Sequence, residues 1–138
     1  MHNLYIVWND SSNTGIPIID EQHRGIISTI NSLHYSIRTG EGDKVIKPTL
    51  ITLEQYIIIH FRTEESLMEH AQYPGFDTHL ELHRDLARKT DAIYRNAQID
   101  GDPDIVLKFM KDWWLHHINI EDKKYVPHVI GLGTPASS

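Results

Sequence analysis

The chain contains no cysteine among its 138 residues, which excludes disulfides, thiolate metal sites and cysteine nucleophiles. It also lacks an apolar run of the roughly 18 residues that a membrane-spanning helix requires. Apolar stretches are short; the one from Tyr56 to Ile59, for example, is ended by His60. No secretory leader is recognisable at the start. Together these absences predict a soluble, cytoplasmic protein that does not insert into a membrane.

Positive charge is also scarce, because 13 Lys and Arg residues face 19 Asp and Glu residues, for a net charge of −6. The basic residues are scattered, whereas nucleic-acid binding needs them clustered, so we expect no nucleic-acid partner. Histidine, in contrast, is abundant, with ten copies. Histidine is the commonest metal ligand and general base among side chains, so the spacing of these residues is the natural place to look for function.

Apolar residues recur at helical spacing along most of the chain. Ile26, Ile27, Ile30, Leu33 and Ile37 predict a first helix over 19–38. Turn signals then separate a second helix over 44–71, a third over 77–100 and a fourth from Pro103 onward. Short turns between four helices predict an all-α, antiparallel up-down-up-down four-helix bundle over residues 1–128. Residues 1–18 are expected to form an N-terminal arm, and residues 129–138 a flexible C-terminal tail.

Two pairs of potential metal ligands have the same helical spacing. His60 and Glu64 are four residues apart on the second predicted helix, and His79 and His83 are four apart on the third. Residues i and i+4 lie on the same face of a helix, so each pair can converge on one ion or on neighbouring ions. A single such pair is weak evidence, because two surface histidines produce the same spacing.

The topology strengthens the case for a shared site. In an up-down bundle, the start of helix one, the end of helix two, the start of helix three and the end of helix four lie at one end. His23, the pair His60 and Glu64, the pair His79 and His83, and His117 all fall at that end. Asp122 is harder to place, since five residues after His117 a straight α-helix has turned it about 140° away. It can join the site only if the helix ends or distorts between the two residues.

The order of these motifs resembles the hemerythrin family, in particular its bacterial members. The resemblance covers about residues 8–126 and is carried by four motifs. These are Trp8 with Gly15-Ile16 and Ile19-Asp20-Glu21-Gln22-His23, His60-Phe61-Arg62-Thr63-Glu64-Glu65, Tyr73-Pro74 followed by His79 and His83, and Trp113 with His117 and Asp122.

The resemblance implies two non-haem irons, oxo- or hydroxo-bridged, with Glu64 and Asp122 bridging the metals. His79, His83 and His117 would complete one iron, and His23 and His60 would serve the other, leaving it one open position. The implied function is reversible O₂ binding at that position, for oxygen storage, delivery or sensing, rather than catalysis. O₂ is the expected partner. A signalling domain or an oxygen-using enzyme is an open possibility for a second, protein partner.

Several alternatives stay open at this point. Imidazole also suits zinc, copper and nickel, so spacing alone indicates only a transition metal. A di-iron oxidoreductase, whether peroxidase-like, NO-reducing or iron-oxidising, could use the same cluster. The carboxylate-rich di-iron proteins carry Glu-x-x-His motifs, however, and this chain contains none, which favours O₂ binding. His116 is an alternative ligand to its neighbour, although the step to Asp122 favours His117.

Three further residues have two interpretations each. Ile120 occupies a position that carries an aliphatic residue over the O₂ pocket in the resembling proteins, and the alternative is ordinary core packing. Trp8 is assigned to the same pocket, again with core packing as the alternative. Asp20 either orients His23 or caps the first helix.

Overall fold

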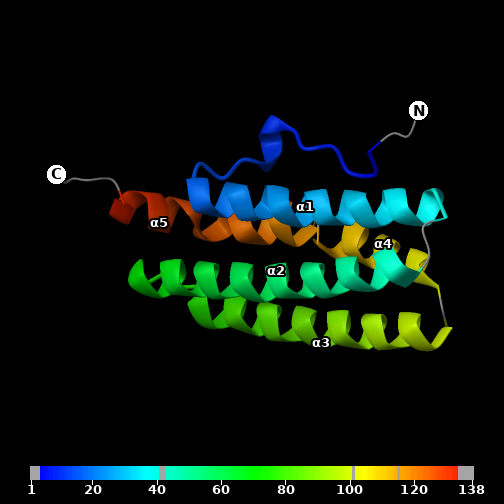
Figure 1. The fold of residues 1–138 in the computed structure, drawn as a ribbon. Helices are drawn as coiled ribbons and strands as arrows, with labels where there is room; N and C mark the ends of the chain where they lie inside the picture. Colours follow the sequence, from blue (N-terminus) through cyan, green and yellow to red (C-terminus); the bar gives the residue numbers. More distant parts are fainter. Residues whose placement is uncertain (1–3, 41–42, 101, 115, 134–138) are drawn as a thin grey trace.

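The structure is a computed structural model that describes residues 4–40, 43–100, 102–114 and 116–133. Three long helices come first: α1 (Pro17–Arg38), α2 (Asp43–His70) and α3 (Phe76–Asp100). A fourth, interrupted helical segment follows, and the four segments are called the limbs of the bundle. The fourth limb consists of α4 (Pro103–Phe109), η2 (Met110–Trp114), η3 (His117–Glu121), η4 (Asp122–Tyr125) and α5 (Val126–Gly133). The limbs pack side by side in alternating directions, and the described residues include no strand (Figure 1). The predicted four-helix bundle is therefore confirmed.

Each long helix buries one continuous stripe of side chains. In α1 the stripe begins at Ile19 and continues through His23, Ile26, Ile30 and Leu33. The spacings of three and four residues keep these side chains on one face of the helix. In α2 the stripe comprises Leu50, Leu53, Ile57, His60, Phe61, Glu64 and Met68, and in α3 it comprises His79, His83, Leu86, Thr90 and Tyr94. Histidines and a glutamate thus take core positions at one end of a stripe that is mainly apolar elsewhere.

The turn between α2 and α3 is closed by a helix-capping motif. Gln72 adopts a left-handed conformation with φ of 53°, although it is not a glycine. Its N–H donates to the Glu69 carbonyl, and the Tyr73 N–H donates to the Met68 carbonyl, which is the Schellman pattern. Tyr73 and Met68 also belong to one apolar cluster. The motif ends α2 one residue earlier than the sequence predicts.

The fourth limb departs from the regular helix that its sequence predicts. Its start agrees, because the Asp102 side chain accepts the Asp104 N–H at 3.1 Å and Pro103 occupies the first helical position. Beyond Phe109, however, two π-helical segments, η2 and η3, and the 3₁₀ segment η4 interrupt the α-helix before α5. Single π turns inside helices frequently mark functional sites.

The described part of the predicted N-terminal arm, residues 4–16, runs along α1 and includes a short 3₁₀ turn, η1 (Asp10–Ser12) (Figure 1). Asn31 of α1 bonds both the N–H and the carbonyl of Ile6, at 2.8 and 2.9 Å. At the other end of the arm, the Asp20 carboxylate accepts from the Thr14 N–H and hydroxyl and from the Gly15 N–H. Asp20 therefore anchors the arm, rather than orienting His23 or capping α1 itself.

The expected flexible tail over residues 129–138 does not begin where the sequence predicts. Helix α5 continues through residue 128 to Gly133, so the predicted boundary lies inside a helix. Its apolar side chains explain this, since Val126 and Val129 pack against the cluster around Tyr125 and Met68. Residues 134–138 lie outside the described residues. No described helix has the length and apolar character needed to cross a membrane.

Candidate metal centre

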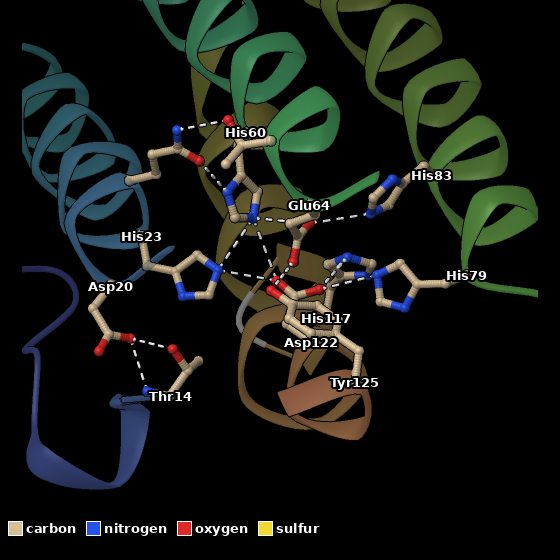
Figure 2. Close-up of polar contacts among 12 residues, drawn as sticks. Thr14, Asp20, His23, His60, Glu64, His79, His83, His117, Asp122 and Tyr125 are labelled. Atoms are coloured by element: carbon tan, nitrogen blue, oxygen red, sulfur yellow. Dashed lines mark hydrogen bonds and ion pairs between the residues drawn. The ribbon is translucent and has the colours of Figure 1, made fainter. Parts of the chain in front are cut away.

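Five imidazoles and two carboxylates meet in the interior at one end of the bundle (Figure 2). They come from α1, α2, α3 and the broken fourth limb and are the residues singled out from the sequence: His23, His60, Glu64, His79, His83, His117 and Asp122. All are buried, and His23, His60, Glu64 and Asp122 have no exposed surface. The predicted convergence of these side chains is therefore observed.

The π-helical segment η3 brings Asp122 to the cluster. In η3 the Asp122 N–H bonds the His117 carbonyl, an i to i+5 bond that widens the turn by one residue. Residues five apart then share a face, and His117 Nε2 lies 2.8 Å from Asp122 Oδ1. This is the distortion that the sequence argument required, since a straight α-helix would turn Asp122 away.

The donors form two groups that share both carboxylates. One group comprises Glu64, His79, His83, His117 and Asp122, and the other comprises His23, His60, Glu64 and Asp122. Within each group the candidate ligand atoms lie within 4.8 Å of one another.

Asp122 divides its two oxygens between the groups. Its Oδ1 lies 3.3 Å from His79 Nε2 and 2.8 Å from His117 Nε2. Its Oδ2 lies 3.0 Å from His23 Nε2 and 3.4 Å from His60 Nε2. A carboxylate placed in this way has one oxygen for each of two neighbouring ions.

Glu64 is oriented by a tyrosine, Tyr125, to which no sequence motif pointed. Its Oε1 lies 3.1 Å from His60 Nε2 and 3.2 Å from His83 Nε2, so it too faces both groups. Its Oε2 accepts a 2.7 Å hydrogen bond from the buried hydroxyl of Tyr125. Tyr125 follows Asp122 by three residues in η4, so the segment that supplies one carboxylate also holds the other.

The electrostatics of the cluster favour charged forms on both sides. Burial lowers the pKa of His60, but Glu64 and Asp122 outweigh it and raise that pKa to about 10. Burial has the opposite sign for a carboxylate and raises the pKa of Asp122. The neighbouring imidazoles, of which His117 has the largest effect, nevertheless hold that pKa well below its usual value. The pKa of Glu64 is also lowered, because His60 and His83 outweigh burial and the charge of Asp122. Two buried carboxylates therefore require positive charge beside them.

The donor set fits metal ions better than it fits hydrogen bonding. Glu64 Oε1, Asp122 Oδ1 and the Nε2 atoms of His79 and His83 are buried and make no hydrogen bond of normal geometry. Buried polar groups are rarely left in this state. Their lone pairs converge over distances near 3.2 Å, and a cation between them would satisfy all four atoms. Transition metals suit this mixture of imidazole and carboxylate donors.

Partners outside the cluster hold two of the imidazoles in place. His83 Nδ1 lies 2.8 Å from Glu65 Oε2, and His60 Nδ1 lies 3.0 Å from Gln22 Oε1. The ring of Phe61 stacks on His83 with a centroid separation of 3.9 Å. No sequence pattern pointed to these roles. Glu65 and Gln22 each adjoin a ligand candidate in the chain, but only the packed structure shows which histidine each one contacts.

The assignment of Ile120 to the pocket is wrong. Its side chain is 48% exposed, whereas that of Ile118 is 1% exposed. The reason is the π-helical geometry of η3, in which residue i+5, not i+3, shares the face of His117. Ile118 is thus the buried isoleucine of this segment.

The structure places Trp8 in the arm, half-buried against the main core cluster. The Arg24 guanidinium lies 4.8 Å from its ring centroid. Both contacts are those of a packing residue, and a role for Trp8 at an O₂ pocket stays a prediction.

The other described histidines lie outside the cluster. His116 is exposed while His117 is buried, which agrees with the preferred register. His70 and His128 are exposed, and His34 stacks on Tyr5 with a centroid separation of 4.6 Å. His2 lies outside the described residues.

The fold and this donor set define a four-helix-bundle protein with a histidine-rich site able to hold metal ions. Residues 14–129 match the family described as the hemerythrin HHE cation binding domain, and the chain belongs to the hemerythrin family.

Relatives and solved structures agree with this membership. The chain is 35% identical to a bacteriohemerythrin of Pseudomonas aeruginosa (strain LESB58), over 91% of this chain and 82% of that one. It is 32% identical to a hemerythrin of Sipunculus nudus, over 86% and 89% of the two chains. The crystal structure of a wild-type hemerythrin superposes with a TM-score of 0.79 at 28% identity, covering 91% of this chain and 98% of that one.

Proposed function

We propose that this protein binds O₂ reversibly at a pair of non-haem irons. The observation that carries the proposal is the division of the donors into two groups that share Glu64 and Asp122. Two carboxylates, each facing both groups, suit two neighbouring ions better than one. Membership of the hemerythrin family supports iron as the metal.

The two groups are unequal, and this inequality suits ligand binding. His79, His83 and His117 would complete the coordination of one iron, while His23 and His60 alone would serve the other. This smaller donor set would leave room for O₂ beside the second iron. A ferrous pair held by these residues would supply the two electrons that O₂ takes up on binding. The protein supplies burial, because bulk water is excluded from side chains with almost no exposed surface.

The donor set favours carriage over catalysis. Five imidazoles outnumber two carboxylates, whereas carboxylate-rich di-iron proteins use four glutamates and two histidines. A carrier should pass through repeated cycles of oxygenation and deoxygenation with little loss of its oxygenated spectrum. Rapid conversion to an inert ferric form, with stoichiometric oxidation of an added substrate, would instead identify an oxidoreductase.

The direct test is metal analysis combined with visible spectroscopy. Protein matured with ample iron should contain two irons per chain and show an O₂-dependent visible absorption from a bridged ferric pair. Deoxygenation under nitrogen should remove this absorption, and readmitted air should restore it. A content of one metal per chain, or of zinc alone, would contradict the proposal.

A further inference from the structure

A histidine that binds metal through Nε2 must keep its proton on the other ring nitrogen, Nδ1. Whether it does so depends on the group that faces Nδ1, and such partners measurably affect metal affinity. In this protein two imidazoles that direct Nε2 into the cluster have visible partners at Nδ1: Glu65 for His83 and Gln22 for His60. The two partners differ in chemistry.

The carboxylate of Glu65 can only accept a hydrogen bond when it is ionised. It therefore keeps the proton on His83 Nδ1 whichever oxygen faces the ring. The amide of Gln22 has no such constraint, because it can turn either its oxygen or its NH₂ group toward His60. Only the oxygen would hold the Nδ1 proton in place. Something else must therefore determine the orientation of the Gln22 amide.

Thr63, one turn beyond Ile59 on α2, provides this constraint. Its hydroxyl donates to the Ile59 carbonyl at 3.0 Å, which uses the only proton of the hydroxyl. The Thr63 oxygen can then only accept from Gln22, and Gln22 Nε2 lies 2.9 Å away. The NH₂ group must face Thr63, so Oε1 must face His60.

We propose that Gln22 and Thr63 act as a positioning pair that keeps the His60 proton on Nδ1 and directs the Nε2 lone pair toward the metal site. The inference rests on the proposed metal-binding function. Thr63 contacts no member of the cluster in this network and acts only through Gln22. Its role is therefore to orient the amide of Gln22, across the packed surfaces of α1 and α2.

The test uses Fe²⁺ alone, titrated under nitrogen against a competing chelator. Thr63→Val removes the hydroxyl but keeps the side-chain shape. We expect it to weaken one of two bound Fe²⁺ ions about tenfold, the lower end of the loss typical for groups that hold a metal ligand. Thr63→Ser restores the hydroxyl and should restore the affinity. Thr29→Val is the matched control, because Thr29 makes the same bond to a helix carbonyl, that of Gly25, away from the site.

A double-mutant cycle separates orientation from general packing. Gln22→Glu replaces the amide by an acceptor that needs no orienting, as Glu65 already does for His83. In the Gln22→Glu background, Thr63→Val should leave Fe²⁺ affinity unchanged, although it weakens binding in the native background. An equal loss in both backgrounds would overturn the inference, because Thr63 would then act without the amide.

The remaining outcomes are also decisive. If the unmodified protein binds two Fe²⁺ and Thr63→Val behaves like Thr29→Val, the inference fails and the proposed function stands. If the unmodified protein binds no Fe²⁺, both fail together. Melting temperatures of the metal-free variants should match within error, so a selective loss of affinity cannot be attributed to unfolding.

Discussion

His117 and His116 are adjacent in the sequence but lie in opposite environments. His117 is buried 2.8 Å from Asp122, while His116 is exposed. We expect His117→Ala to halve or abolish iron loading, because it removes one imidazole and leaves Asp122 with one neighbour fewer. His116→Ala should leave loading nearly intact. Iron analysis of the two purified variants decides the register, and the reverse pattern would show that the ligand lies one residue earlier.

Ile118 and Ile120 form a second informative pair. Ile118→Ala should destabilise the protein by about 2–5 kcal/mol, as large-to-small changes in a core do. Ile120→Ala should change stability by about 0.5 kcal/mol or less, because its side chain is largely at the surface.

Ile118 directly follows His117 in η3 and is buried, so its truncation to alanine opens space close to a ligand candidate. We therefore expect the oxygenated form of Ile118→Ala to decay faster at unchanged iron content. Stopped-flow spectroscopy and melting curves measure the two effects separately. An unchanged decay rate in this variant would limit Ile118 to core packing.

At the scale of elements, the turn between α2 and α3 contains a residue under backbone strain. Gln72 has φ of 53°, a left-handed conformation that costs a non-glycine residue roughly 1–2 kcal/mol. Gln72→Gly should therefore stabilise the protein by about 1 kcal/mol.

The control for this change is Gln55→Gly, at an exposed position inside α2, which should destabilise by about 1 kcal/mol. Urea denaturation of both variants measures the difference. Destabilisation of similar size in both would mean that the left-handed turn is absent in solution.

The elements also differ in how well sequence periodicity describes them. In α1, α2 and α3, spacings of three and four residues identify the buried face, and they place His23, His60 and His79 on it correctly. The fourth limb does not follow this rule beyond Phe109. There the chain adopts π-helical and 3₁₀ turns, so α-helical periodicity no longer identifies the buried face, and Ile118 is buried while Ile120 is exposed.

For the whole molecule, the site connects all four limbs of the bundle (Figure 2). Metal that binds only the folded state stabilises it, by about 2.7 kcal/mol for one site at a free concentration 100 times its Kd. We expect holo-protein to melt about 5–10 °C above metal-free protein. Differential scanning calorimetry before and after chelation measures the shift, and His117→Ala should reduce it. Equal melting temperatures would count against a metal site between the helices.

By itself the sequence determined the helices, the order of the limbs and the types of donor. It also indicated that the donors share one end, because helical periodicity and short turns are local properties. Only the tertiary structure decided that Asp122 reaches His117 and that Tyr125 holds Glu64. It likewise decided that Gln22 faces His60 while Glu65 faces His83. These contacts join segments far apart in the chain or require a π turn, so their geometry depends on packing between helices that no single segment's pattern contains.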